Sequence, residues 1–300
     1  MYYTLSMRKI FIFCLLLVIC IIFTSCADFA ALFDLEEDTD ERSYVVPDSS
    51  DSLSVHFIDV GQADCILIRL PEDRVVMIDA GSNGAAGTIL SYLEAQNIHR
   101  IDYLIGTHPH EDHIGSLDSV IDARDIGKIY MPRVENNTKT FEDVLTAIQN
   151  KGLRVSTPVA GEFIVNEPEK GLTVQILAPN NERYSNLNNY SIVVRVEYYN
   201  TSFLFTGDAE ELSEGEMLEK GLNLSADVLK VGHHGSNTST SDAFLEAVNP
   251  LYAIIPCGTG NRYGHPDGET LDKLADITVF RLDQTGTVVA VSDGNTINFE

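Results

Sequence analysis

Residues 107–113 read THPHEDH and gather three histidines and two acids directly after the apolar segment IDYLIG. His108 and His110 stand two positions apart, and Asp112 and His113 follow them. A loop that turns over a strand end can therefore aim the first pair at one point and the second pair at another. Imidazole and carboxylate ligands together favour zinc, with manganese or iron as alternatives. The stretch predicts a site for one or two metal ions.

Two further polar clusters, TGDAE at residues 206–210 and VGHHGS at residues 231–236, also follow apolar runs directly. Reactive groups are commonly carried on loops that a rigid sheet positions. Two metal ions about 3.5 to 4 Å apart can hold both oxygens of a displacement reaction and acidify a water between them. Asp208 is the candidate for the carboxylate that bridges the ions. Glu111 is expected to face water instead, because its neighbours turn inward.

Strands and helices alternate from residue 54 onward. Helices are predicted near residues 88–96, 115–123, 140–151, 242–248 and 269–275. The strand candidates are SVHFIDV, ADCILIRL, VVMIDA, IDYLIGTH, IGKIYMP, LRVSTPV, LTVQILAP, YSIVVRVEY, SFLFTGD, ADVLKVG, LYAIIPC, TVFRL and GTVVAVS. Two β-rich halves, each with helices on one outer face, predict an α/β fold in which two packed sheets lie between helical layers, a four-layer αββα sandwich. The polar clusters would then meet along one edge of the sandwich.

The sequence HPHEDH resembles the His-x-His-x-Asp-His signature of the metallo-β-lactamase superfamily. Six motifs narrow the resemblance to the extracellular hydrolase domain of the ComEC competence family, and more distantly to bacterial phosphorylcholine esterases. They are HFIDVGQADCILIRLP, VMIDAG, NNYSIVVRVEY, FLFTGDAE, DVLKVGHHGSNTS and NRYGHP. The resemblance covers roughly residues 54–300, which we take as the hydrolase domain.

The resemblance implies a metal-ligand set. It assigns His108 and His110 to one ion, Asp112 and His113 to the other, and Asp208 to both. One of His233 and His234 would complete the second site; we favour His234, with His233 facing the substrate. The candidates for catalytic groups are Asp112, His233 and His265. His265 can exchange protons near neutral pH, or it can simply pack on Tyr263.

Four more residues are candidates for supporting the ligands or contacting the substrate. The resemblance places Asp59 and Asp79 at strand ends, where Asp79 would hydrogen-bond a liganding imidazole; each can equally be a turn-forming Asp before Gly. The superfamily pattern has another histidine ligand before TGDAE, but residues 114–232 contain no histidine. Asn189 is expected near that position, and an amide is a weaker zinc ligand than imidazole. Ser236 can bind substrate oxygens or cap a helix.

The N-terminal segment, residues 1–26, has the basic residues Arg8 and Lys9, an apolar run and small residues before Cys26. It predicts an export signal with a lipobox-like end, an ordinary signal or an uncleaved anchor being the alternatives. The lipid on Cys26 would hold the protein at the outer face of the cytoplasmic membrane. Residues 27–53 carry nine acidic side chains against one arginine, which predicts a disordered tether. Cys65 and Cys257 are expected to be buried free thiols.

The charge of −25 and the lack of a basic stripe argue against tight binding of duplex nucleic acid. The resulting hypothesis is an exported phosphodiesterase using one or two Zn²⁺ ions, or Mn²⁺. It would act through a metal-bound hydroxide on single-stranded DNA or an envelope polymer. The alternatives are hydrolysis of another bond (lactone, thioester or β-lactam), or a lipoprotein whose metal site orders a binding surface without catalysis.

Overall fold

Two β-sheets form the framework of residues 52–300, the part of the chain that the computed structural model describes. The predicted signal, Cys26 and all but the end of the predicted tether lie outside these residues. The first sheet has the order β15-β14-β1-β2-β3-β4-β5-β6. Its strands are β1 Leu53–Phe57, β2 Ile66–Arg69, β3 Val75–Ile78, β4 Arg100–Ile105, β5 Asp125–Tyr130, β6 Val155–Ser156, β14 Val288–Ser292 and β15 Ile297–Phe299.

The second sheet has the order β13-β12-β11-β10-β9-β8-β7. Its strands are β7 Phe163–Glu167, β8 Leu172–Ala178, β9 Val193–Tyr198, β10 Thr201–Phe205, β11 Val228–Lys230, β12 Tyr252–Ile255 and β13 Thr278–Arg281. In each sheet one run of neighbouring strands is parallel, β3 to β6 in the first and β10 to β13 in the second. The loops at the carboxyl ends of these runs carry the polar clusters.

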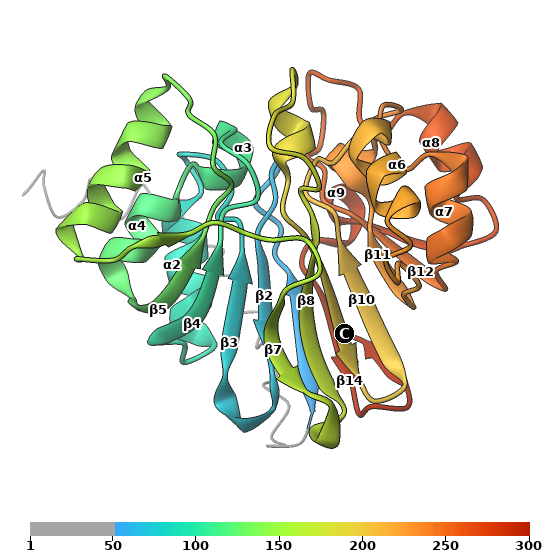
Figure 1. Ribbon diagram of the computed structural model, residues 1–300, viewed down its shortest axis with the longest axis horizontal. Coiled ribbons are helices and arrows are strands. Elements are labelled where there is room, and N and C mark those ends of the chain that lie inside the picture. The colour runs from blue at the N-terminus through green and yellow to red at the C-terminus, as the bar shows by residue number, and fades with distance from the viewer. Residues whose placement is uncertain (1–51) are drawn as a thin grey trace, which may run out of the picture. The chain divides into compact units, whose positions relative to one another are not determined.

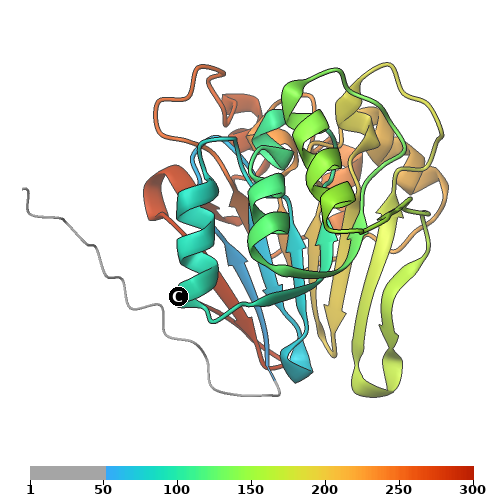
Figure 2. The same ribbon diagram turned by 90° about the vertical axis from the view of Figure 1, so that its left-hand side faces the viewer.

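Helices cover the outer face of each sheet, which gives the predicted four layers (Figure 1 and Figure 2). Buried side chains of α2, α4 and α5 pack on the first sheet, and those of α6, α7 and the segment around α8 pack on the second. The α-helices are α2 Ala86–Ala95, α3 Glu111–Ile114, α4 Leu117–Ala123, α5 Lys139–Asn150, α6 Glu211–Glu219, α7 Asp242–Val248, α8 Gly268–Lys273 and α9 Leu282–Thr285. Short 3-10 turns are η1 Pro71–Asp73, η2 Pro168–Lys170, η3 Leu187–Tyr190 and η4 Gly232–Gly235.

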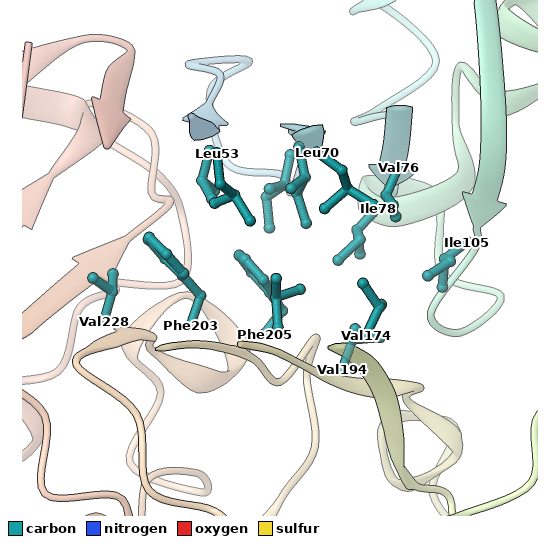
Figure 3. Close-up of a cluster of buried hydrophobic side chains, with 14 of the residues drawn as sticks. Leu53, Leu70, Val76, Ile78, Ile105, Val174, Val194, Phe203, Phe205 and Val228 are labelled. Atoms are coloured by element: carbon teal, nitrogen blue, oxygen red, sulfur yellow. The ribbon is translucent and has the colours of Figure 1, made fainter. Parts of the chain in front are cut away.

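The main core lies between the two sheets, where apolar side chains of both interdigitate (Figure 3). Alternation along a strand sends successive side chains to opposite faces. In β1, Val55 and Phe57 enter this core, while His56 points to the outer face and contacts Tyr92 of α2. In β10, Phe203 and Phe205 face the other sheet, opposite Leu53 and its neighbours. The sheets are thereby fixed to each other, and so are the loops at their edges.

The predicted helices are all present, with ends shifted by up to two residues. Helix α6 was not predicted, because its segment ELSEGEMLE has no apolar stripe. Strand β7 was also missed; it lies at the edge of the second sheet and its burial is incomplete. Cys65 and Cys257 are buried and free, as predicted. Among the described residues, no helix is both long and apolar enough to cross a bilayer.

Candidate metal centre

The THPHEDH loop leaves the carboxyl end of β4 and turns at once into α3. Asp79, in the loop after β3, fixes this turn: its carboxylate accepts from the backbone N–H and the hydroxyl of Thr107, both at 2.7 Å. The loop then packs so closely on its neighbour that a Cβ at position 115 would overlap the backbone nitrogen of Asn83. Gly115 is therefore required for the approach.

Asp112, His113, Asp208 and His234 bring one ligand atom each to within 4.8 Å of one another. His113 Nε2 lies 3.2 Å from Asp208 Oδ1, and His234 Nε2 lies 3.4 Å from Asp112 Oδ2 and 3.8 Å from Asp208 Oδ1. Ligand atoms at about 2.0 to 2.2 Å from a tetrahedral zinc stand roughly 3.3 to 3.6 Å apart. These three separations lie within a few tenths of an ångström of that spacing, and all pairs of the four ligand atoms lie within 4.8 Å.

Three of these ligand atoms are buried without a hydrogen-bond partner among the described residues: His113 Nε2, His234 Nε2 and Asp208 Oδ1. Buried polar atoms are nearly always hydrogen-bonded, because leaving one unpaired costs about 1 to 3 kcal/mol. Their convergence on one point is what a divalent cation would satisfy. The donor set of two imidazoles and two carboxylates thus fits the metal that the sequence predicts.

The opposite ring nitrogens of the two histidines are held by acceptors. His113 Nδ1 lies 2.7 Å from Asp79 Oδ2, and His234 Nδ1 lies 2.8 Å from the carbonyl oxygen of Pro256. In each ring Nδ1 is therefore held as a donor, and Nε2 is the atom that faces the cluster and would bind an ion. Asp79 therefore contacts His113, one of the imidazoles of the motif.

His108 faces the other oxygen of Asp208, and His110 contacts His108. His108 Nε2 is 2.9 Å from His110 Nδ1 and 3.9 Å from Asp208 Oδ2. Behind it, His108 Nδ1 contacts the hydroxyl groups of Thr107 and Ser191 at 3.2 and 3.3 Å. The two oxygens of Asp208 therefore face two different sets of imidazoles, as a bridging carboxylate requires.

The pKa values of the cluster favour metal-binding protonation states at two of its groups. Burial alone would raise the pKa of Asp208, but His113 and His234 hold it well below the usual value. Burial, followed by the neighbouring His113, lowers the pKa of His108 well below its usual value. Asp208 is therefore ionised and His108 neutral at neutral pH, which are the forms that bind metal.

Asp64 and Lys230 belong to this centre although sequence reasoning did not find them. Both are buried, and Lys230 Nζ donates to Asp64 Oδ2 at 2.5 Å and to the carbonyl oxygen of Gly207 at 2.7 Å. Asp64 Oδ1 lies 3.4 Å from His234 Nδ1. Each is a charged residue inside an apolar strand-like segment, ADCILI for Asp64 and VLKV for Lys230. A charge in such a segment indicates a buried ion pair, and this was the sequence feature that could have identified them.

The four-ligand cluster borders a cavity of about 560 Å³. Asp112, Asp208 and His234 line it, and so do His233 and His265. The ring of His265 stacks on Tyr263 at 5.8 Å and meets that of His233 edge-on at 5.6 Å, so the packing interpretation and the cavity-facing one are both compatible with its position. The wall also includes Arg262, Asn136, Asn188 and Gln62.

The remaining candidates have local partners. Asp59 Oδ1 accepts from the N–H of Gly61, as a turn-forming aspartate does. Asn189 Oδ1 accepts from the N–H groups of Glu210 and Ser213 at the start of α6, so its amide supports that helix. The hydroxyl of Ser236 lies 3.1 Å from the hydroxyl of Thr238 and also accepts a hydrogen bond from the Thr238 N–H. None of these three side chains lines the cavity within the described residues.

Comparison with known proteins identifies the family. Residues 58–259 match the metallo-β-lactamase superfamily. The chain is 31% identical over 264 residues to ComE operon protein 3 of Bacillus subtilis, covering 82% of this chain and 34% of that protein. It is 30% identical over 256 residues to competence protein ComA of Neisseria gonorrhoeae, with 82% and 33% covered. The chain therefore spans about a third of the length of these curated relatives.

Among solved structures, the metallo-β-lactamase fold protein YhfI from Bacillus subtilis aligns with a TM-score of 0.55 and 13% identity, covering 81% of this chain and all of that one. At that identity the likeness concerns the fold. The sequence match shows that the chain belongs to the metallo-β-lactamase superfamily of metal-dependent hydrolases. The predicted resemblance to the ComEC family is confirmed at about 30% identity.

Proposed function

We propose that this protein is an exported metal-dependent phosphodiesterase. The observation that carries the proposal is the carboxylate of Asp208, buried between imidazoles that approach each of its two oxygens. Such an arrangement is suited to two ions held by one bridging carboxylate, a geometry widely used for phosphoryl chemistry. Zinc is the proposed metal, with manganese as the alternative. The proposed ligands are His108, His110, Asp112, His113, Asp208 and His234.

The substrate class is supported by the cavity and by the relatives. Arg262 at the rim supplies a cation that can pair with a phosphate oxygen, and the amide groups of Asn136, Asn188 and Gln62 offer further donors. The relatives are named as competence proteins, which fits a nucleic acid substrate. We therefore propose a phosphodiester in single-stranded DNA or in an envelope polymer as the substrate.

The bound ions would supply Lewis acidity and a means of activating water at neutral pH. The protein's own groups hold and orient the reactants. Asp208 and the surrounding imidazoles would hold the ions, and Arg262 would offset the charge of the phosphate. Burial, together with His233, lowers the pKa of His265, so that its ring is neutral at pH 7 and can accept a proton. We assign protonation of the leaving oxygen to a water, with His265 orienting that water.

The location is also a proposal. We propose that residues 1–26 export the protein and that a lipid on Cys26 holds it at the outer face of the cytoplasmic membrane, with the acidic residues after it as tether. The domain at residues 54–300 would then be exposed to extracellular polymers. Because the chain has a net charge of −25, we do not propose tight binding of duplex nucleic acid.

Hydrolysis of bis-p-nitrophenyl phosphate by the purified protein, with zinc or manganese supplied, tests the activity. We expect turnover in the wild type and losses of about 10³-fold or more in His110→Ala and Asp208→Ala, because each removes a proposed ligand. Glu111→Gln is the matched control from the same loop: Glu111 accepts from the backbone of Asn83 and should keep full activity. No turnover by folded, metal-loaded wild type would contradict the proposal and favour another bond or a binding role.

A further inference from the structure

One ligand is missing from the set that faces Asp208 Oδ2. The superfamily pattern has a histidine between the THPHEDH and TGDAE motifs, and this chain has none there. The local candidates are engaged elsewhere: Ser191 Oγ accepts from the N–H of Asp208 and contacts His108 Nδ1, and the amide of Asn189 supports α6. His108, His110 and Asp208 would give the ion on this side three protein ligands, one fewer than the superfamily pattern with its additional histidine, and a fourth ligand would complete a tetrahedral set.

His233 and His234 form a turn that is unusual for two consecutive residues. Their φ values are +50° and +55°, in the left-handed region that costs a non-glycine residue about 1 to 2 kcal/mol. Strain of this kind persists at functional sites where the surroundings impose it. Its result here is that the two rings reach opposite oxygens of one carboxylate. His234 Nε2 lies 3.8 Å from Asp208 Oδ1, and His233 Nε2 lies 3.6 Å from Asp208 Oδ2.

We propose that His233 replaces the missing histidine and binds the first metal ion together with His108, His110 and Asp208. This rests on the proposed metal-dependent function and adds a ligand to it. Two imidazole nitrogens, from His108 and His233, approach the same oxygen from the two different sheets, at 3.9 and 3.6 Å. The adjacent histidines of the HHG turn would thus serve one ion each.

The surroundings of His233 hold its ring in the orientation that this role needs. Its Nδ1 contacts the Thr238 hydroxyl at 3.1 Å, which leaves Nε2 as the atom that faces Asp208. Its backbone N–H donates to the carbonyl oxygen of Gly207, so the turn is attached to the loop that carries the carboxylate. An outer hydrogen bond of this kind orients histidine ligands and typically changes metal affinity 10- to 100-fold when it is removed.

Two other roles compete for the same place. His233 lines the cavity with about a quarter of its side chain exposed, so it can contact substrate instead of metal. Asn188 also lines the cavity, and its Oδ1 is buried without a hydrogen-bond partner among the described residues, so this amide can be the ligand. The experiment must therefore separate a metal ligand from a substrate contact, and His233 from Asn188.

Metal counting on the purified full chain separates them without any substrate. We expect two zinc ions in the wild type, and His233→Ala should lose at least about tenfold in affinity for one ion while it retains the other. His110→Ala should lose the same ion, so the variant His110→Ala/His233→Ala should still bind one. His265→Ala and Asn188→Ala should both bind two ions with wild-type affinity.

Cobalt substitution gives a direct spectroscopic readout. A thiolate bound to Co²⁺ produces an intense near-ultraviolet charge-transfer band, and the wild-type protein serves as the blank for the chain's own cysteines. We expect the band in His233→Cys and none in the matched variant His265→Cys, whose side chain lines the same cavity. The band reports ligation even if the variant hydrolyses nothing.

The proposal is overturned by any of three results. They are one ion in the wild type, two ions at wild-type affinity in His233→Ala, and loss of an ion in Asn188→Ala with no charge-transfer band in His233→Cys. Because none of these measurements uses a phosphodiester, a protein that binds two ions but cleaves no phosphodiester would refute the proposed function and leave this assignment of His233 standing.

Discussion

His56 and His113 are both buried histidines in the first sheet's half of the molecule, and their surroundings differ completely. His56 lies under α2 with both ring nitrogens partnered, by Ser54 at 3.0 Å and Tyr92 at 2.8 Å. His113 lies at the edge of the sheets with Asp79 on Nδ1 and an Nε2 that has no hydrogen-bond partner among the described residues. Burial is therefore shared by a structural histidine and a candidate ligand, and the unsatisfied nitrogen is what separates them.

The surroundings of His56 and the metal-binding cluster around His113 also differ in charge. Burial and then Arg69 lower the pKa of His56 to about 3, so the ring stays neutral. Burial would do the same to His113, but Asp208 and Asp79 raise its pKa well above the usual value. One cluster is neutral and complete without a ligand, while the other holds buried charges whose balance depends on Lys230 and on metal.

The largest effect on stability is expected from replacing Lys230. Lys230→Met would leave Asp64 buried and without its cation, which should lower the free energy of unfolding of the metal-free protein by about 3 to 5 kcal/mol. Adding Asp64→Asn should restore most of the loss. Urea unfolding of the single and double variants measures both; a double variant as unstable as Lys230→Met would show that the pair is not what balances the cluster.

Metal removal should come next in size. A ligand at 100 times its dissociation constant stabilises the folded state by about 2.7 kcal/mol. Chelation should therefore lower the stability of the wild type by about that amount, and of His56→Gln equally, because His56 takes no part in binding. His234→Ala should respond much less. Thermal unfolding with and without chelator checks this, and equal responses in all three proteins would remove the distinction between the clusters.

The pH dependence of stability should identify His56 as the structural histidine. Its folded pKa of about 3 lies below the unfolded value of 6.5, so the unfolded state binds more protons between these values. The stability that His56 contributes is present above pH 6.5 and is lost as the pH falls towards 3. Between pH 7 and pH 5 the stability advantage of the wild type over His56→Gln should shrink by about 2 kcal/mol. An advantage that stays constant over that range would mean that His56 does not titrate as described.

The smallest effect is expected from Glu111, the solvent-exposed acid of the metal-binding loop, which lines the cavity without belonging to the four-ligand cluster. Glu111 Oε1 accepts from the N–H of Asn83, and glutamine keeps that acceptor. Glu111→Gln should change stability by no more than about 0.5 kcal/mol and zinc affinity by about twofold or less. Isothermal titration with zinc checks the affinity; a tenfold change would place Glu111 among the groups that control the ions.

The parts of the site that sequence reasoning could predict are those in which neighbouring residues act together. His108, His110, Asp112 and His113 share one loop, so their joint purpose is visible in six positions. The contribution of Lys230 depends on Asp64, which is far away in the chain, and no local pattern connects them. The direction of the Asn189 side chain is set by α6, a helix whose sequence has no periodic signal.

The same reason explains the fold. Strands buried on both faces read as apolar runs and were found, whereas β7 at a sheet edge was not. Helices with an apolar stripe, such as α5 with Val144, Ala147 and Ile148 buried, were found to within about a residue. Elements stabilised by long-range packing or by single hydrogen bonds leave no periodic trace, so they become visible only in three dimensions.

The four-ligand cluster joins the two halves of the chain. Asp112 and His113 follow a strand of the first sheet, and Asp208 and His234 follow strands of the second. An ion cannot be captured by either half alone with its full affinity, so metal uptake should come after the sheets have docked and not nucleate the fold. Activity would then depend on complete folding, because only a chain whose two sheets have docked can bind the metal that the proposed reaction requires.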